Sequence, residues 1–321
     1  MHLLFDIGGT NFRAAKFDGA LTVLWRQNTP TYRDGLTEPQ LNERIAAMIL
    51  ETVRAEAANA VPLEGIGVCF AGPVNAGGDI LAGPAIYGAP LSKPYALGEL
   101  LRAEHPNAVV TNDLTAAAMR YTERHRDFLL LTVSSGIGGK LVMDGRVRIG
   151  EGGLEGEIGH APAAFCGEVA IPCSCGMGDN HLNAIASGIG LAHVASRLRD
   201  ASLAEAFNTS PLRARPDILT PELTRAADAG DPFAAGVIDF CVRPLAHAVS
   251  LLLTSCYLEK VIFIGGVAQN CPYYMASLTR QLCGFGVYNY TDAMIREKLA
   301  LGANDDNHGL LGLVKMLGAA A

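Results

Sequence analysis

The chain has little aromatic content and no excess of positive charge. It contains one tryptophan, and aromatic residues make up 7% of its 321 residues. Lysine and arginine together number 25 against 32 aspartates and glutamates, which gives a formal net charge of −7. Proteins that bind nucleic acid usually carry a basic patch or stripe. Nucleic acid is therefore not an expected partner.

The sequence also lacks signals for secretion or membrane insertion. Its N-terminus has no basic stretch followed by an apolar core, which a secretory signal requires. The most apolar long segment, from Phe233 to Leu258, is interrupted by Asp239, Arg243 and His247, so a buried helix is expected there. The eight cysteines show no disulfide framework, and their thiols are expected to be reduced. The sequence thus predicts a cytoplasmic protein with no membrane partner.

Hydrophobic residues and glycine are plentiful. Hydrophobic residues make up 50% of the chain, and glycine occupies 36 positions. A chain of this length can bury two domain cores, since domains usually run to roughly 100–200 residues. The frequent glycines indicate tight turns or places where the backbone approaches a ligand closely.

Short apolar runs alternate with amphipathic segments. Strands are predicted at Leu3–Ile7, Ile66–Phe70, Phe128–Val133 and Val261–Ile264. Helices are predicted at Leu41–Val53, where apolar residues recur every four positions, and at Leu114–Tyr121. Strands mixed with helices in this way predict an α/β protein.

A strand, a glycine turn and a returning strand occur twice. The first set is Leu3–Ile7, Gly8-Gly9 and Phe12–Phe17. The second is Phe128–Val133, a turn ending in Gly138-Gly139, and Lys140–Met143. The two sets predict a weak internal repeat, in which each half of the protein opens on a glycine hairpin.

Three predicted strands are followed by paired glycines, at Gly8-Gly9, Gly138-Gly139 and Gly265-Gly266. Such loops can turn backbone N–H groups toward a phosphate, although each alone could be a plain turn. Asp6, beside the first loop, is either a turn residue or a carboxylate that holds Mg²⁺ through water. The loops match neither the P-loop pattern nor the dinucleotide fingerprint, so a nucleotide site here belongs to another class.

Polar residues follow another strand and a later loop. Asn112 and Asp113 lie where a strand ends and a helix begins, so Asp113 is either a helix cap or a general base. Cys173 and Cys175, with His160 upstream, are either ordinary loop residues or ligands of a tetrahedral zinc ion.

Several of these segments together resemble a known family. Asp6–Thr10, Ser135–Gly139 and Gly265–Ala268 resemble the two phosphate motifs and the adenosine motif of the actin-like ATPase and sugar-kinase superfamily. The resemblance narrows to the ROK family (repressors, open reading frames and kinases) through the remaining motifs, which are Gly65–Val74, Asn112-Asp113, Gly153–His160, Cys173–Gly176 and Gly302–Gly312.

The resemblance implies two ribonuclease-H-like domains with a cleft between them. The expected N-terminal domain covers residues 1–113 together with a C-terminal helix at about 302–321. The expected C-terminal domain covers residues 114–301, contains a zinc-loop insertion at about 157–183, and carries nucleotide binding and oligomerisation. Homodimers or homotetramers are common in this family.

The resemblance also implies the roles of individual residues. Asp113 is the expected catalytic base, and Asn112, Glu157, His160 and Asn183 are expected to bind the sugar. ATP and Mg²⁺ are expected to be held by a further set of residues: Asp6, Gly8, Gly9, Thr10, Ser135, Gly136, Gly138, Gly139, Gly265 and Gly266.

The metal motif departs from the family pattern. That pattern has a third cysteine followed by Leu-Glu, whereas the aligned positions here are His181 and Asn183, after one extra residue. A structural Zn²⁺ is therefore expected on His160, Cys173, Cys175 and His181, with Cys166 as a substitute for either histidine.

The expected sugar site also departs from the family pattern. Asn183 replaces a sugar-binding glutamate, and Ala85–Pro90 replaces an Asn-Leu and a Trp. These changes predict an altered preference for ring hydroxyls, unless a neighbour such as Glu155 or Asp179 compensates.

The expected activity is transfer of the γ-phosphoryl group of ATP to a hydroxyl of a hexose, with glucose or an N-acetylhexosamine as first choice. Two alternatives belong to other classes. One is a sugar-sensing regulator without kinase activity, although the chain starts at the first phosphate strand and shows no helix-turn-helix before it. The other is an ATPase of the same superfamily, which would have no use for the Glu157–His160 segment.

Overall fold

The chain forms two compact units. The computed structural model describes all residues except 19–21, 32–34, 58–61, 151, 164–169, 306 and 321. The first unit comprises Met1–Arg124, Gly145–Glu155 and Asp305–Ala321, and the second comprises His125–Asp144 and Gly156–Asn304.

The division of the chain differs from the expected one at its first boundary and at Gly145–Glu155, a segment expected in the second domain that lies in the first unit. Helix α4 (Asp113–Met119) was expected to open the second domain, but it lies in the first unit. The physical reason is its packing against the C-terminal helix α13 (His308–Ala320), which belongs to the same unit.

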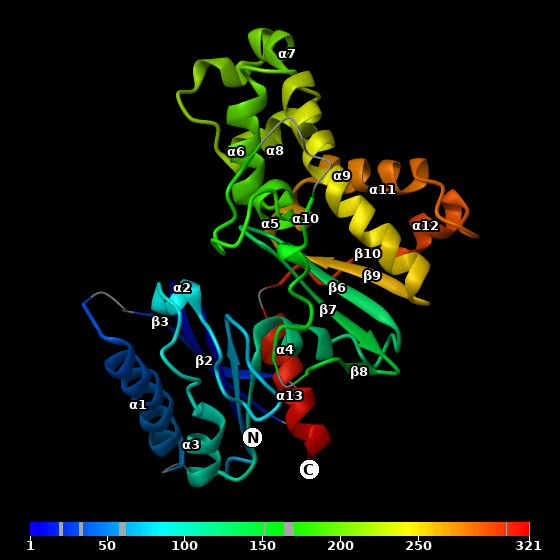
Figure 1. Ribbon diagram of the computed structural model, residues 1–321. Helices are drawn as coiled ribbons and strands as arrows, with labels where there is room; N and C mark the ends of the chain where they lie inside the picture. Colours follow the sequence, from blue (N-terminus) through cyan, green and yellow to red (C-terminus); the bar gives the residue numbers. More distant parts are fainter. Residues whose placement is uncertain are drawn as a thin grey trace. The chain divides into compact units, whose positions relative to one another are not determined.

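The first unit contains a five-stranded sheet in the order β3-β2-β1-β4-β5 (Figure 1). Strand β1 pairs antiparallel with β2 and parallel with β4, and β4 pairs parallel with β5. The bounds are β1 (His2–Ile7), β2 (Asn11–Phe17), β3 (Val23–Pro30), β4 (Gly65–Phe70) and β5 (Ala108–Asn112). The three strands predicted in this region lie within β1, β2 and β4.

Helices cover both faces of this sheet. Successive strand residues point to opposite faces, and β1 carries buried apolar side chains on both. On one face Leu3, Phe5 and Ile7 pack with α1 (Glu38–Ala57) and α3 (Leu97–Glu104). On the other face Leu4 packs with residues of α4 and α13. Figure 1 shows α1 and α3 on one side of the sheet and α4 and α13 on the other.

The sheet of the second unit repeats the same pattern. Its strands include β6 (Phe128–Val133), β7 (Ile137–Met143), β9 (Lys260–Ile264) and β10 (Leu299–Leu301). Strand β6 pairs antiparallel with β7 and parallel with β9, and β9 pairs parallel with β10. Thus β7-β6-β9-β10 has the strand order and directions of β2-β1-β4-β5, which supports the predicted internal repeat.

The second glycine turn is shorter than predicted. Strand β7 begins at Ile137, whereas the sequence predicted its start at Lys140. Gly138 and Gly139 therefore lie in the strand, where they pair with Thr132 and Leu131 of β6. The turn itself is closed by a hydrogen bond from the Ser134 amide to the Gly136 carbonyl, 2.9 Å long.

Helices make up most of the rest of the second unit. The long helix α9 (Pro232–Ser255) is apolar enough to cross a membrane by length and composition. It packs against α5 (Leu182–Ala186), α6 (Gly188–Leu198), α8 (Thr220–Asp228) and α11 (Pro272–Gly284). Phe233, Ile238 and Leu245 on α9 are fully buried. The predicted buried helix is confirmed. The second unit also contains α7 (Ala204–Thr209), α10 (Gly266–Asn270) and α12 (Asp292–Lys298).

The contact between α4 and α13 yields a stability prediction. A Cβ atom at Gly312 of α13 would lie 1.6 Å from the Ala116 carbonyl oxygen of α4. Gly312→Ala should therefore destabilise the protein by about 2–3 kcal/mol or more, as overpacking of a tight core does. Thermal or denaturant unfolding measures the change.

Gly318 of the same helix provides the matched control. A Cβ atom there would have no heavy atom within 4 Å. Gly318→Ala should be neutral or stabilising by up to about 1 kcal/mol, because alanine is the better helix former. Equal effects of the two substitutions would show that the close approach of α4 and α13 does not limit stability.

Candidate active site

Two acidic positions lie at one edge of the first sheet. Asp6 of β1 is in register with Cys69 of β4, which is in register with Thr111 of β5. Asn112 ends β5, and Asp113 begins α4. Because neighbouring strands lie about 4.8 Å apart, Asp6 and the Asn112-Asp113 pair flank Cys69 at the carboxyl ends of parallel strands. The structure therefore brings these predicted site residues together.

Asp6 is partly buried and has two side-chain partners. Arg13 of β2 donates a hydrogen bond from Nη1 to Asp6 Oδ2 at 3.2 Å, and the Cys69 thiol donates to Asp6 Oδ1 at 3.6 Å. Burial raises the pKa of Asp6, and this effect exceeds the opposing effect of Arg13. Burial also raises the pKa of the Cys69 thiol well above its ordinary value, and the charges of Asp6 and Asp113 add to that rise. Cys69 is thus a neutral thiol between two carboxyl groups.

The helix cap at this edge is Asn112. Its Oδ1 accepts hydrogen bonds from the amides of Leu114 and Thr115 at 3.0 and 3.1 Å, which is N-cap geometry. Its Nδ2 donates to the Gly72 carbonyl at 2.9 Å and to Asp113 Oδ1 at 3.0 Å. The cap considered for Asp113 therefore belongs to Asn112, although Asp113 Oδ1 also accepts from the Leu114 amide at 2.8 Å.

The first glycine turn lies beside the same edge. The Gly8 amide donates to the Asn11 carbonyl at 2.9 Å, which closes the turn between β1 and β2. A Cβ atom at Gly9 would lie 2.5 Å from the carbonyl oxygen of Ala85 in α2 (Pro84–Tyr87). The segment Ala85–Pro90, which departs from the family pattern, therefore begins directly against this turn.

The second unit contains a cavity of about 400 Å³ at the end of β6. Ser135 and Gly266, both predicted to bind nucleotide, line it. Gly265 has a φ of 94°, and a Cβ atom there would lie 2.7 Å from the Val133 carbonyl oxygen, so this close approach requires glycine. The cavity is mostly apolar beyond its polar loop, as a pocket for a nucleotide base would be. Its lining comprises Ser134, Ser135, Gly188, Ile189, Thr220, Pro221, Thr224, Gly266, Val267, Asn270 and Cys271.

Part of this lining is not predicted by the sequence. Gly188 and Thr220 come from the N-terminal ends of α6 and α8, and the Thr220 hydroxyl donates to the Gly188 carbonyl. Both helix starts carry local signals, since Ser187 caps α6 and Thr220-Pro221 opens α8. Those signals predict helix starts, but they do not show that the helices meet at β6.

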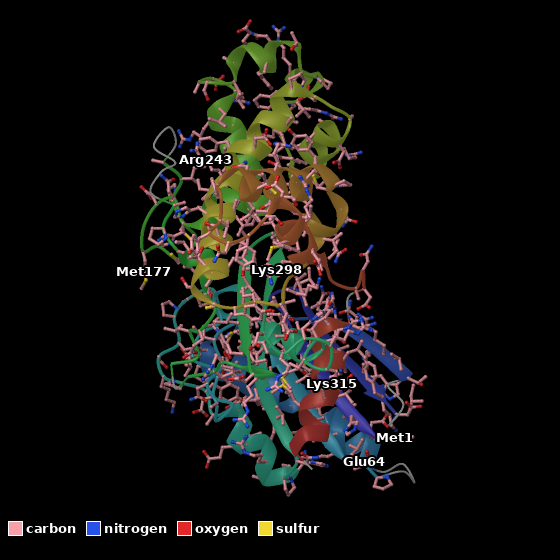
Figure 2. All side chains as sticks on the ribbon, turned by 90° about the vertical axis from the view of Figure 1, so that its right-hand side faces the viewer. Met1, Glu64, Met177, Arg243, Lys298 and Lys315 are labelled. Atoms are coloured by element: carbon pink, nitrogen blue, oxygen red, sulfur yellow. The ribbon has the colours of Figure 1, made fainter. Side chains whose placement is uncertain are left out.

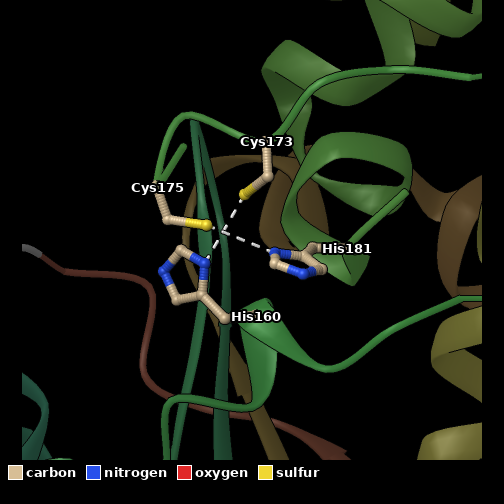
Figure 3. A group of neighbouring side chains, drawn as sticks. All are labelled: His160, Cys173, Cys175 and His181. Atoms are coloured by element: carbon tan, nitrogen blue, oxygen red, sulfur yellow. Dashed lines mark hydrogen bonds between the residues drawn. The ribbon is translucent and has the colours of Figure 1, made fainter. Parts of the chain in front are cut away.

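Four side chains of the types that bind metal ions converge in the second unit. His160, Cys173, Cys175 and His181 place one ligand atom each within 4.8 Å of all the others. Cys173 Sγ lies 3.5 Å from His160 Nδ1, and Cys175 Sγ lies 3.3 Å from His181 Nδ1 (Figure 3). Cys173 and Cys175 lie in a loop whose next large side chain, Met177, is 89% exposed and points into solvent (Figure 2).

These distances fit a tetrahedral metal ion. With Zn–S bonds of about 2.3 Å and Zn–N bonds of about 2.0–2.1 Å, a sulfur and a nitrogen ligand lie about 3.5 Å apart. Two sulfur and two nitrogen donors are typical of zinc among the common metals. The four predicted ligands are thus brought together, while Cys166 lies outside the described residues.

The predicted sugar-binding residues of the second unit belong to this cluster or lie within three positions of one of its members in the sequence. His160 turns Nδ1 toward Cys173, and its Nε2 lies 3.9 Å from Glu157 Oε2. Glu157 immediately precedes the short 3₁₀ helix Ile158–His160. Asn183 lies in α5, and its Oδ1 accepts a hydrogen bond from the Ile137 amide at 2.9 Å. Asn183 therefore contacts the second glycine turn, a contact that its alignment with a sugar-binding glutamate did not predict.

Comparison with known proteins gives a family match over nearly the whole chain. The family model described as "ROK family" matches residues 3–318. A C(7)-cyclitol 7-kinase from Streptomyces hygroscopicus subsp. limoneus is 37% identical, over 98% of this chain and 93% of that protein. A 2-epi-5-epi-valiolone 7-kinase from Actinoplanes sp. is 31% identical, over 88% of this chain and 82% of that protein.

Among solved structures, the chain is similar to a ROK family glucokinase from Streptomyces griseus in complex with glucose and AMPPNP. The TM-score is 0.68 at 23% sequence identity, and the match covers 99% of this chain and 98% of that one. The likeness shows a shared two-domain α/β fold.

The raised pKa of Asp6 leads to a pH-dependent stability prediction. An ionised Asp6 is unfavourable in its buried position, so Asp6→Asn should increase the free energy of unfolding at neutral pH. Because its folded-state pKa lies above the ordinary value, the wild-type protein takes up a proton as pH falls, and the advantage of the variant should then shrink. Denaturant unfolding at about pH 7.5 and about pH 5 measures this.

The exposed carboxylate Asp217 provides the control, and Asp217→Asn should change stability little at either pH. If Asp6→Asn instead destabilised the protein by the same amount at both pH values, the ion pair with Arg13 would outweigh the burial.

Proposed function

The chain belongs to the ROK family, and from this premise we propose that it transfers the γ-phosphoryl group of ATP to the hydroxyl on carbon 7 of a C7-cyclitol. It is an ATP-dependent carbohydrate kinase. What we propose beyond this activity is the identity of the phosphoryl acceptor. The observation that carries it is the 37% identity to a C(7)-cyclitol 7-kinase over 98% of the chain.

The pattern of retained and altered residues supports a non-hexose acceptor. Asp6, Asp113 and the glycine turns, which the transfer step needs, all match the family motifs. The departure at an acceptor position is the segment Ala85–Pro90, while the second departure, Asn183, contacts the Ile137 amide. A cyclitol has a carbon atom where a hexopyranose has its ring oxygen. A changed segment at an acceptor-binding position is what a change of ring chemistry would require.

Asp113 is the proposed general base. It would accept the proton of the attacking hydroxyl and orient that oxygen toward the γ-phosphorus, as a carboxylate does in kinases. The hydrogen bonds to Asp113 Oδ1 from the Leu114 amide and from Asn112 Nδ2 hold the carboxylate in one orientation. Through this contact Asn112 would position the base, in addition to its proposed contact with the acceptor.

The remaining roles divide by unit. In the first unit, Asp6 would hold Mg²⁺ through water, and the turn Gly8–Thr10 would donate backbone N–H groups to phosphate. In the second, the cavity lined by Ser135 and Gly266 would take the nucleotide. Glu157 and His160 would bind acceptor hydroxyls, since a carboxylate accepts strong hydrogen bonds from them.

A hexose is the second candidate acceptor, because the structurally similar glucokinase was solved with glucose. The expected homodimer or homotetramer and the cytoplasmic location stay predictions.

An acceptor panel tests the proposal. Purified protein, ATP and Mg²⁺ are combined with a C7-cyclitol such as 2-epi-5-epi-valiolone, with glucose and with N-acetylhexosamines, and ADP release is measured. We expect kcat/KM for the cyclitol to exceed that for each hexose by about tenfold or more, the scale on which a binding pocket discriminates related substrates. A higher kcat/KM for glucose would contradict the proposed cyclitol acceptor and support a hexose acceptor.

The control for this assay is Asp113→Asn. It should retain nucleotide binding but lose about 100-fold or more in kcat, the scale of general base catalysis. Near-normal turnover would remove Asp113 from the base role.

A structural Zn²⁺ is the second part of the proposal. His160, Cys173, Cys175 and His181 would hold it through two thiolates and two neutral imidazoles, which balance its charge of +2. The ion would join the 3₁₀ helix after Glu157 to the start of α5. Glu157, 3.9 Å from His160 Nε2, would orient that imidazole in the way carboxylates orient metal-binding histidines.

Metal analysis tests this part. Protein purified without chelator should contain about one zinc per chain, and Cys175→Ala should lose the zinc and lower the unfolding temperature. Cys256→Ala is the control, because this half-buried cysteine lies outside the cluster and should leave the zinc content unchanged. Metal-free wild-type protein would contradict the proposal.

A further inference from the structure

The second glycine turn is attached to α5 through one side chain. Asn183 Oδ1 accepts a hydrogen bond from the Ile137 amide at 2.9 Å. An amide N–H can only donate, so the oxygen of Asn183 must be the end that faces Ile137. The same oxygen lies 3.0 Å from the position that a Cβ atom at Gly136 would occupy, so the amide group packs closely against the turn.

The backbone groups next to the Ile137 amide are also in contact. A Cβ atom at Gly159 would lie 2.1 Å from the Ile137 carbonyl oxygen. The Gly139 amide donates to the Gly156 carbonyl at 3.0 Å. The start of β7 is therefore held by Asn183 at the Ile137 amide and by the segment 156–159 at the Ile137 carbonyl and the Gly139 amide.

This turn forms part of the nucleotide cavity. Ser134 and Ser135 line the cavity, and their carbonyl groups accept hydrogen bonds from the amides of Gly188 and Ile189 at 2.7 and 3.3 Å. One end of the turn is thus fixed by the start of α6, and the other end is fixed by Asn183. The position of Asn183 is itself constrained, because His181 of the metal-binding cluster directly precedes α5.

We propose that Asn183 is a positioning residue for the nucleotide: it holds the Ser134–Ile137 turn in the shape that receives the phosphates. The inference rests on the proposed function, in which this cavity binds ATP. The side chain acts through the turn and does not need to touch the acceptor.

Three measurements on Asn183→Ala test the proposal. The dissociation constant of AMPPNP, measured without acceptor, should rise about fivefold to tenfold, the effect of losing one hydrogen bond. KM for ATP should rise likewise, while KM for the acceptor should stay within about twofold of the wild-type value. Hydrogen exchange of the Ile137 amide should become faster, because the amide loses the oxygen to which it donates its hydrogen bond.

Two further variants complete the design. Asn183→Asp keeps a side-chain oxygen that can accept the hydrogen bond from the Ile137 amide, so this amide should stay slow to exchange. Rapid exchange in this variant would overturn the proposal even if Asn183→Ala failed to fold. Asn208→Ala, at an exposed position of α7, should change none of the three quantities.

The opposite pattern in Asn183→Ala would also overturn the proposal. That pattern is a raised KM for the acceptor together with unchanged AMPPNP binding and unchanged Ile137 exchange. It would indicate that Asn183 binds the phosphoryl acceptor. If the wild-type protein phosphorylated no acceptor at all, the proposed function would fail, whereas AMPPNP binding and Ile137 exchange would still decide the role of Asn183.

Discussion

The parallel pairing of β1 with β4, and of β4 with β5, is the constraint on which the acceptor side of the site depends. Parallel strands end at the same edge of a sheet. Asp6 and Asp113 are 107 positions apart in the chain, yet this pairing brings them to the two sides of Cys69. The burial that raises the pKa of Asp6 follows from the same packing. The proposed role of Asp6 thus depends on an arrangement that costs some stability at this residue.

In the second unit, the same arrangement of strands is joined to a loop that the first unit lacks in the part of the chain described. The segment from Gly156 to Asn183 packs on the start of β7 at both of its ends, through Gly159 and through Asn183. The four side chains of the metal-binding cluster lie between those ends in sequence and meet in space. A metal ion there would hold the two contacts with β7 together. Packing thereby connects Glu157 and His160, the proposed acceptor-binding residues, to the Ser134–Ile137 turn.

Prediction from sequence worked best where a local pattern has a single physical meaning. The apolar runs of β1, β4, β6 and β9 and the interrupted apolar helix α9 were identified because strand and helix periodicity need no partner to be recognised. It worked less well where two meanings share one pattern. The helix cap was considered for Asp113, but Asn112 fills it, since both side chains can cap and only their orientation distinguishes them. Ile137–Gly139 was assigned to a turn, because glycine in a strand carries no side-chain signal.

The sequence by itself determined the class of the protein. The order of its glycine turns, the Asn112-Asp113 pair and the Cys-His loop indicated an α/β sugar kinase of the ROK family, because these motifs are local and their chemistry is readable from residue type. Only the tertiary structure decided what those residues touch. It gave Asn183 the Ile137 amide as its partner, completed the cavity beside Ser135 with Gly188 and Thr220, and placed α4 against α13. Each of these contacts joins residues distant in sequence, and such contacts are set by how whole elements pack, which no local pattern records.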